Sequence, residues 1–242
     1  MLAATAVKKS SQIKAQCEQL IHRSFPKFLL NPNLVTNTEP TFEDLDYTVV
    51  LTKQDKVVAF GITIPFNWSG HLNELPTFNH MVTTGLQIQS LNQDFNSLAG
   101  YAICISPDEQ GKGLATTVIE EMKNLARKAN CEHCIMPVRP SEKIKYPLQS
   151  LTDYSKWRRS DGQLLDQWLR IHENKGAKYL EAIESCDVYS GSLEDWSEST
   201  GMVFPTSGSY IVPGAISPLI VDVDKDIGTL SEGHVWVNHP LD

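Results

Sequence analysis

Residues 103–122 read Ile-Cys-Ile-Ser-Pro-Asp-Glu-Gln-Gly-Lys-Gly-Leu-Ala-Thr-Thr-Val-Ile-Glu-Glu-Met, and this stretch decides the fold. An apolar run from Leu98 ends at Ser106-Pro107, and glycines follow at 111 and 113. Apolar residues then recur at helical spacing from Leu114 onward. The pattern predicts a buried strand, a tight glycine-containing turn and an amphipathic helix in direct succession.

Such a turn places unpaired backbone N–H groups at the positive end of the helix dipole, where an anion binds well. Gly111 and Gly113 let the backbone close around a phosphate, Ala115 permits close approach, and Lys112 adds positive charge. The spacing matches neither a P-loop nor a dinucleotide-binding fingerprint. Judged on spacing alone, an ordinary glycine-capped loop is an equally good interpretation.

Upstream of this stretch, the sequence predicts a helix at 12–25, a hairpin of two strands at 47–52 and 56–64, and a helix at 78–92. Downstream, it predicts a helix at 114–129, a strand at 134–138, a helix at 164–175 and late strands at 177–182 and 186–189. Pro137 removes one ladder donor and suggests locally open pairing. The aromatic and basic stretch at about 139–163 is interpreted as an insertion over a site.

Residues 103–122 resemble the acetyl-CoA motif of the GNAT (N-acetyltransferase) superfamily. Its signature, Gln/Arg-x-x-Gly-x-Gly/Ala, is matched by Gln110, Gly113 and Ala115. The resemblance covers roughly residues 12–190. It implies an α/β (α+β) fold with a mixed, mostly antiparallel central sheet flanked by helices. The expected organisation is a GNAT-like domain at 1–190, with a C-terminal extension at 191–242 packed on the same domain.

The resemblance also implies acetyl-CoA, or another acyl-CoA, as cofactor. The backbone of Ile103, Cys104 and Ile105 would bond the pantetheine arm. The pyrophosphate would lie on the loop formed by Gln110, Gly111, Lys112, Gly113, Leu114 and Ala115.

A tyrosine in the pattern Tyr-x-x-x-Gly-Phe often protonates the leaving thiolate in this family. Here His172 takes the tyrosine position before Gly176-Ala177, so His172 is the predicted acid. A histidine that only satisfies a helix end is the alternative. Tyr101, on the central strand, is a second catalytic candidate. Residues of an apolar strand more often belong to the core, and this is the favoured interpretation of Tyr101 and Cys104.

Two further groups of residues are candidate sites. Arg139, Trp157, Arg158 and Arg159, with Lys143 and Lys145 nearby, are predicted to bind the substrate or the ribose phosphate of the cofactor, and a solvated face is the alternative. Cys131-Glu-His-Cys134 has the spacing of half a zinc site, but no second pair follows, so no metal is expected.

Composition excludes several classes of protein. The 242 residues carry a net charge of -8, which argues against a nucleic-acid binder that neutralises phosphates. No apolar run approaches the length of a membrane span, and residues 1–12 do not have the order of a signal peptide. Five cysteines suit a reducing compartment, so a cytoplasmic location without membrane partners is expected. A homodimer is left open.

The predicted function is transfer of an acetyl or other short acyl group from acyl-CoA to an amine of a small molecule or peptide, by direct attack. Two alternatives stand beside it. One is a GNAT-like enzyme that processes a CoA or carrier-protein thioester without an amine acceptor. The other is a catalytically silent acyl-CoA-binding module.

Overall fold

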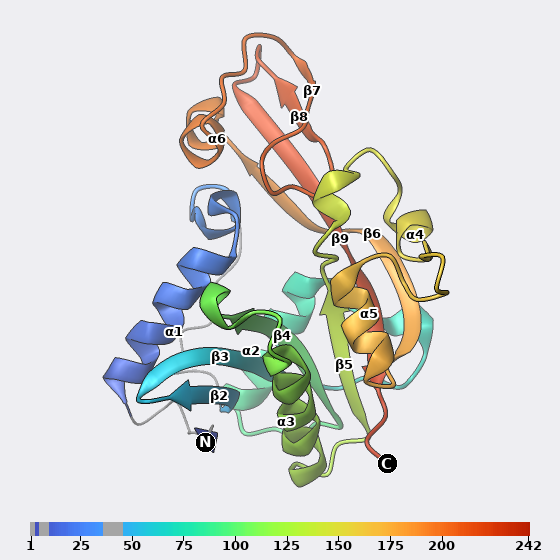
Figure 1. Cartoon of the computed structure of the whole chain (residues 1–242). Helices are drawn as coiled ribbons and strands as arrows, with labels where there is room; N and C mark the ends of the chain where they lie inside the picture. Colours follow the sequence, from blue (N-terminus) through green and yellow to red (C-terminus); the bar gives the residue numbers. More distant parts are fainter. Residues whose placement is uncertain (1–2, 5–9, 36–45) are drawn as a thin grey trace.

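The computed structural model describes residues 3–4, 10–35 and 46–242, and Figure 1 shows the arrangement of their helices and strands. Residues 1–2, 5–9 and 36–45 lie outside the described residues. Most of residues 1–12, predicted not to be a signal peptide, therefore also lie outside them. A nine-stranded sheet runs in the order β1-β2-β3-β4-β5-β9-β8-β7, with β6 paired to β9. All its pairings are antiparallel except that of β4 with β5. The predicted mixed, mostly antiparallel fold is confirmed.

The first half of the chain supplies one edge of the sheet and two helices. Its elements are β1 (Ala3–Ala4), α1 (Ser11–Ser24), η2 (Lys27–Leu30), β2 (Tyr47–Lys53), β3 (Lys56–Phe66), η3 (Leu72–Glu74), α2 (Phe78–Ser90) and β4 (Ser97–Ile105). Each predicted helix and strand in this region is confirmed to within three residues. The Ser10 hydroxyl accepts the Ile13 N–H and caps α1, and Thr77 caps α2 in the same way.

The second half begins with η4 (Pro107–Glu109), α3 (Leu114–Lys128) and β5 (His133–Val138). It continues through η5 (Lys143–Lys145), α4 (Leu151–Tyr154), α5 (Gln167–Asn174), β6 (Lys178–Gly191), α6 (Leu193–Thr200), β7 (Gly208–Tyr210), β8 (Leu219–Asp222) and β9 (Ile227–His239). The helix predicted at 164–175 starts later, because Asp166 accepts the N–H groups of Trp168 and Leu169 as its cap. The two predicted late strands form one strand, β6, interrupted by an irregularity between Ile183 and Asp187.

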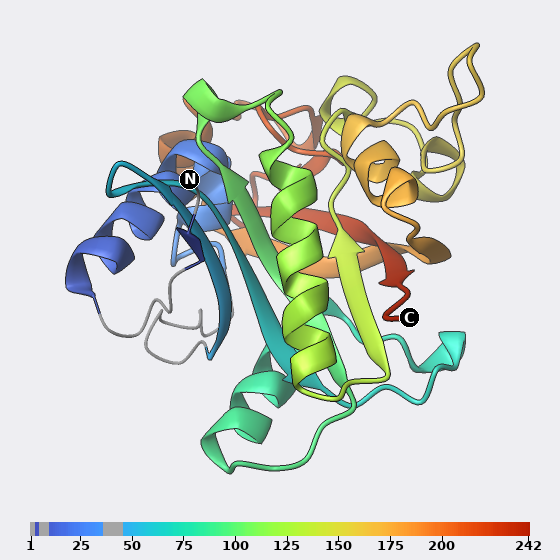
Figure 2. The ribbon, with the colours of Figure 1, turned by 60° about the horizontal axis from the view of Figure 1, so that its bottom comes forward.

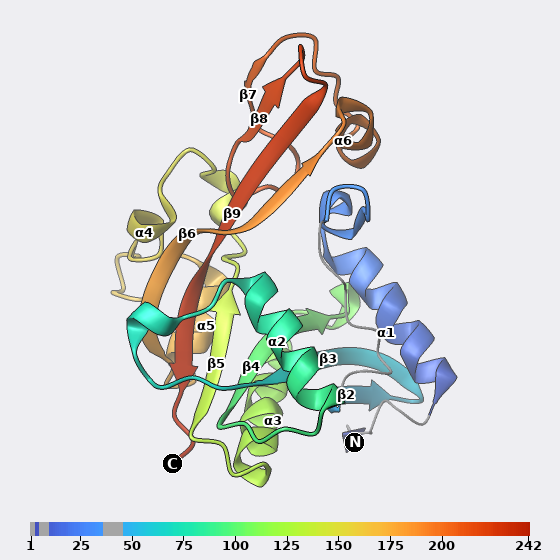
Figure 3. The ribbon, with the colours of Figure 1, turned by 180° about the vertical axis from the view of Figure 1, so that it is seen from behind.

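Two helical layers cover the two faces of the sheet. Helices α1 and α2 lie on one face, where Cys17 and Met81 pack with Phe60 and Trp236. On the other face, α3 and α5 bring Val118 and other apolar residues against the opposite side chains of the same strands (Figure 3). Side chains along a strand point alternately to its two faces, so strands buried on both sides have almost no polar positions.

The last fifty residues differ from the prediction of an extension added at residue 191. Strand β9 lies between β5 and β6, so it is an interior strand of the sheet. The end of β6 and the start of β9 extend past β5. Together with β7 and β8 they form an arm that projects from the body in Figure 1. This long-range pairing cannot be predicted from a local sequence pattern. It makes the C-terminal residues part of the core.

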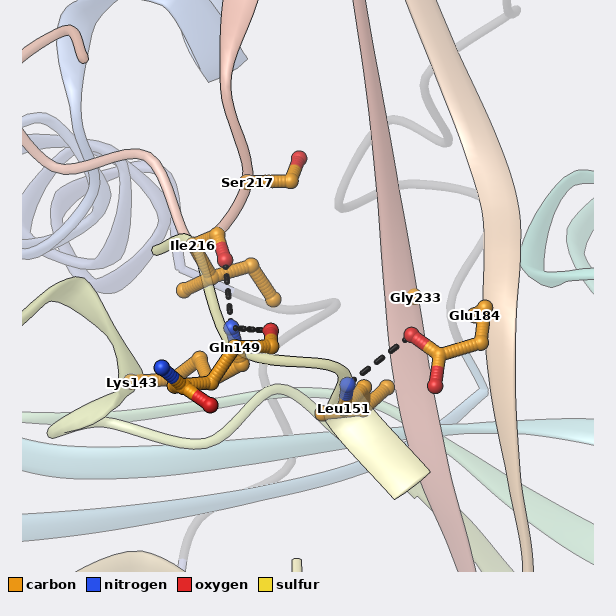
Figure 4. Close-up of a pocket in the computed structure, with 7 residues that line it drawn as sticks. All are labelled: Lys143, Gln149, Leu151, Glu184, Ile216, Ser217 and Gly233. Carbon is orange, nitrogen blue, oxygen red and sulfur yellow. Dashed lines mark hydrogen bonds between the residues drawn. The ribbon is translucent and has the colours of Figure 1, made fainter. Parts of the chain in front are cut away.

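The residues at about 139–163 form a loop with short helices beside β6, held by a buried lysine. Lys143 is 2% exposed, and its Nζ donates to the carbonyls of Tyr146, Gln149 and Ile216 at 2.6–2.9 Å. Glu184 of β6 accepts the Leu151 N–H in the same small cavity (Figure 4). These hydrogen bonds offset the cost of burying the ammonium group.

Helix α3 lies close to β3 because residue 61 is glycine. A Cβ on Gly61 would lie 2.5 Å from Val118 Cγ1 and 2.7 Å from Met122 Sδ. We expect Gly61→Ala to lower the free energy of unfolding by about 1–3 kcal/mol through overpacking. Urea denaturation measures this, and the double variant with Val118→Ala should recover part of the loss. Additive effects of the two changes would contradict the close contact.

Candidate functional site

The parallel ladder between β4 and β5 stops after three residue pairs. Ser97, Leu98 and Ala99 pair with 133–135, after which β4 continues only with β3 and β5 only with β9. Figure 2 shows the two strands on either side of α3. From Gly100 to Ile105, β4 therefore has no strand partner on its β5 side.

The hydrogen bond made by the first residue after β4 shows which way the unpaired backbone groups of β4 point. The Ser106 N–H donates to the Val58 carbonyl of β3 at 2.8 Å. Because N–H groups alternate along a strand, those of Ile103 and Ile105 point to the open side, and that of Cys104 points to β3. A ligand with amide groups can bond this edge as an added strand does.

The loop after β4 presents backbone donors to solvent. Gly111 and Gly113 have φ of 73° and 78°, and a Cβ on either would meet nothing within 4 Å. Gly113 is the N-cap of α3 and provides no side-chain cap. Within the described ranges, no acceptor is recorded for the N–H groups of residues 111–116, whereas that of Thr117 reaches the Gly113 carbonyl. The loop can therefore receive an anion at the positive end of α3.

Two lysines and the carboxylates of Asp108 and Glu109 lie at this loop. Lys112 Nζ is 3.0 Å from Glu109 Oε2 and 2.8 Å from the Asp108 carbonyl, and Lys53 Nζ is 3.3 Å from Glu109 Oε1. Hydrogen bonds, first from Lys112 and then from Lys53, lower the pKa of Glu109. Because the two lysines are balanced by two carboxylates, the preference of this loop for an anion comes from its backbone N–H groups and the helix dipole.

His172 lies inside the protein. It is 1% exposed, its Nδ1 is 2.9 Å from Nε2 of His239, and its ring packs edge-on against Trp168 at 4.6 Å. Burial, and then the neighbouring His239, lower the pKa of His172 to about 3. Its carbonyl accepts the N–H groups of Lys175 and Ala177 at the end of α5. This geometry favours the helix-end alternative, and the role of acid stays a prediction.

Tyr101 lies where the open part of β4 begins. Its ring stacks on Phe78 of α2, with centroids 5.4 Å apart and an interplanar angle of 22°. The residue is partly exposed and belongs to the α1 and α2 face of the sheet. The structure thus places Tyr101 at the opening, on the face opposite α3.

The predicted substrate-binding group is divided by the structure. Arg139 makes two hydrogen bonds to the buried Glu232, at 2.6 and 2.9 Å. Trp157 packs with Tyr146 and Tyr154, and the two neighbouring arginines form exposed ion pairs, Arg158 with Glu173 and Arg159 with Asp161. The structure does not bring these four residues together, and their binding role stays a prediction.

The structure also gathers polar residues that sequence patterns did not single out. Asp187 of β6 and Glu232 and His234 of β9 are all buried at the end of β5. Charged side chains at inward positions of apolar strands were the available signal. All five cysteines are free thiols, and the described residues hold no group of three metal-ligating side chains.

An open strand edge beside a loop of unpaired backbone donors is the arrangement that the acyl-CoA site of an acyltransferase requires. The sequence model of the Acetyltransferase (GNAT) family matches residues 15–144, more than half of the chain, and the chain belongs to this family. It transfers an acyl group from acyl-CoA to an amine, as an N-acetyltransferase.

Relatives agree with this assignment. The arginine N-acetyltransferase avaD of Aspergillus versicolor is 27% identical over 214 residues, covering 79% of this chain and 73% of that protein. The loading GNATL domain of CurA from Lyngbya majuscula has a TM-score of 0.60 at 14% identity, covering 100% of this chain and 97% of that one. The GphF GNAT-like decarboxylase, solved with isobutyryl-CoA, has a TM-score of 0.56 at 15% identity, with both chains fully covered. At these identities the two structures show the fold.

We expect Gly113→Asp to weaken acetyl-CoA binding by at least about 100-fold, because a carboxylate would face the phosphates at the loop. Isothermal titration calorimetry measures the change. Gly201→Asp is the matched control, since Gly201 ends α6 with φ of 70° and is equally open to a Cβ. Both variants introduce similar backbone strain. Unchanged affinity in a folded Gly113→Asp variant would place the phosphates elsewhere.

We expect His172→Gln to reduce the dependence of stability on pH. Burial lowers the pKa of His239 to about 4, so both rings stay neutral in the folded protein while the unfolded chain takes up protons below about 6.5. The free energy of unfolding should therefore fall as pH drops from about 6.5 toward 4, by about 1.4 kcal/mol per pH unit per histidine. Because the pKa of Asp187 is raised to about 7, this residue makes the free energy of unfolding rise as pH falls over the same range. It does so equally in wild type and in the variant.

Urea denaturation at pH 7, 6 and 5 measures this slope, and His172→Gln should lower it by about one proton. Turnover of the variant should stay within about threefold of wild type if His172 serves the helix end. A loss of about 100-fold or more in turnover with an unchanged slope would instead support the predicted acid.

None of the helices among the described residues has both the length and the apolar character needed to cross a membrane.

Proposed function

We propose that the chain transfers an acetyl group from acetyl-CoA to the amine of a small cationic acceptor of the arginine type. The observation that supports it most is the set of backbone donors at residues 111–116, beside the open edge of β4. In this proposal the loop binds the pyrophosphate and the free groups of Ile103 and Ile105 bond the pantetheine arm. An N–H on that edge also polarises the thioester carbonyl.

The loop and the strand edge support one continuous binding path. The loop follows β4 directly and ends at the first turn of α3. Helix α3 then packs on one face of the sheet that contains β4. Phosphates at residues 110–115 would therefore direct the thioester into the opening between β4 and β5. Cys104 would contribute mainly through its place in the strand, because its own N–H faces β3.

Small cationic acceptors are supported by charge and by the named relative. The chain has a net charge of -8, and two buried carboxylates, Asp187 and Glu232, lie on the face away from α3. A relative that covers most of this chain is named for acetylation of arginine. Arg158 and Arg159 keep the proposed role of contacting the ribose phosphate, and five free thiols support the proposed cytoplasmic location.

Acetylation of arginine, agmatine and putrescine tests the acceptor class, with leucine as an α-amine that lacks the second positive charge. We expect kcat/KM for the preferred cationic amine to exceed that for leucine by at least about tenfold, because the acceptor face is acidic. Thiol release and mass spectrometry of the acetylated product are the measurements.

Three results would contradict the proposal in different ways. Equal rates with leucine would remove the preference for cations. Thiol release without any amine would favour thioester processing, and binding of acetyl-CoA without turnover of any acceptor would favour a silent binding module. A blank without acceptor accounts for the five native thiols.

A further inference from the structure

A buried polar cluster lies at the carboxyl end of β5, on the face of α1 and α2. Asp187 of β6 stands directly opposite Glu232 of β9, and His234 follows two residues later on the same face. Asp187 is 2% exposed, Glu232 1% and His234 7%. Buried polar groups in such numbers require hydrogen-bond or ionic partners, or else serve a function.

Glu232 is fully partnered. It accepts two hydrogen bonds from Arg139 and a third from the Ile216 N–H at 2.8 Å. The Arg139 side chain also donates to the Gly214 carbonyl at 2.7 Å. This ion pair neutralises one of the two carboxylates in the cluster and leaves Asp187 without a cation of its own.

Asp187 is not satisfied in this way. Among the described residues, no donor is recorded for either of its carboxylate oxygens. His234 lies beside it: the His234 Nδ1 is 3.5 Å from Asp187 Oδ2 and likewise makes no hydrogen bond. Nδ1 is fully enclosed, whereas Nε2 is not among the enclosed atoms. The imidazole thus turns one nitrogen to the carboxylate and leaves the other for a ligand.

Strand β5 and helix α2 define the surroundings of His234. Val235 pairs with Val138, the last residue of β5, so His234 lies one position past the end of that strand. Phe78 stacks on His234 and on Tyr101, each at 5.4 Å and 22°. Phe78 therefore links His234 to Tyr101, which lies on the unpaired part of β4, on the face of the sheet that α3 leaves free.

We propose that His234, oriented by Asp187, is the base that removes the proton from the acceptor amine. This inference rests on the proposed acetyl transfer and assigns a residue to its acceptor side. His234 Nε2 takes one proton from the ammonium group of the acceptor while its Nδ1–H gives a proton to the Asp187 carboxylate, so the pair together gains one proton. The freed nitrogen forms a bond to the thioester carbon.

The remaining steps balance without another reactant. As the C–S bond breaks, the electron pair goes to sulfur and the second amine proton is transferred to the thiolate, giving amide and free thiol. Asp187 then returns its proton to Nδ1, and Nε2 releases one proton to solvent. The 3.5 Å separation suits a carboxylate–imidazole hydrogen bond that shortens when substrate is bound.

The electrostatics of the cluster set the pH at which this base works. Burial and then the Glu232 charge raise the pKa of Asp187 to about 7, while burial and then Arg139 lower the pKa of His234 to about 3. The groups that face this pair are Arg139, Glu232, Cys186, Tyr189 and Tyr101, with Lys143 beyond Glu232. The pair holds one proton below about pH 7 and must lose it to act. We therefore expect kcat/KM to rise with pH through about 7.

Kinetics of His234→Asn and Asp187→Asn test the assignment, with Asp222→Asn as the matched control at a half-buried position of β8. We expect turnover to fall about 100-fold or more in the first two variants while acetyl-CoA affinity stays within about threefold. The rise near pH 7 should disappear, and the residual rate should follow the pKa of whichever acceptor amine is used. The control should match wild type.

A second measurement does not depend on turnover. In protein labelled at histidine with nitrogen-15, the His234 ring signals should change with pH in step with Asp187, and Asp187→Asn should abolish that change. Thermal stability of Asp187→Asn should be unchanged or higher, because a buried unpaired acid is removed.

Turnover within about threefold of wild type, with the pH profile retained, would overturn the role of His234. Ring signals indifferent to Asp187→Asn would overturn it even if wild type acetylated no amine tested. Failure of wild type to acetylate any amine, with the coupled titration present, would instead count against the proposed acceptor reaction and leave the proton-accepting pair standing.

Discussion

The early end of the β4 and β5 ladder is the constraint on which the rest of this structure depends. A parallel pair that stops after three residues leaves one edge of a central strand without partners, a costly arrangement unless a ligand bonds it. The same divergence brings the Gly111–Gly113 loop, the first turn of α3 and the free groups of Ile103 and Ile105 to one end of the sheet. Gly61 fixes this arrangement by allowing α3 to lie against β3.

Charge is divided between the two faces that meet at the opening. The α3 face offers backbone donors and two lysines around Glu109, although the protein as a whole is acidic. The opposite face holds Asp187 and Glu232, of which only the second is neutralised by an arginine. A negatively charged cofactor and a positively charged acceptor would therefore approach the same opening from different sides. This separation reduces competition between the two ligands for one surface.

Buried histidines illustrate how similar side chains take different roles. His172 and His239 face each other inside the protein near the ends of α5 and β9, and both rings stay neutral over the ordinary pH range. His234 is equally desolvated but has a carboxylate beside one nitrogen and an accessible edge at the other. Burial without a neighbouring carboxylate thus keeps His172 and His239 as a neutral structural pair. Burial with a carboxylate and an opening gives a candidate base at His234.

The strand, turn and helix of residues 97–128 could be predicted from local sequence, because glycine conformations and a helical period are local properties. The sequence also predicted the helices and strands of the first half to within a few residues. Tertiary structure alone decided that β9 lies between β5 and β6, that Arg139 pairs with Glu232, and that Asp187 meets His234. These contacts join residues far apart in the chain, and their energies come from burial and pairing that no short stretch contains. His172 shows the same limit, since the motif gave its position and only packing against Trp168 and His239 revealed its surroundings.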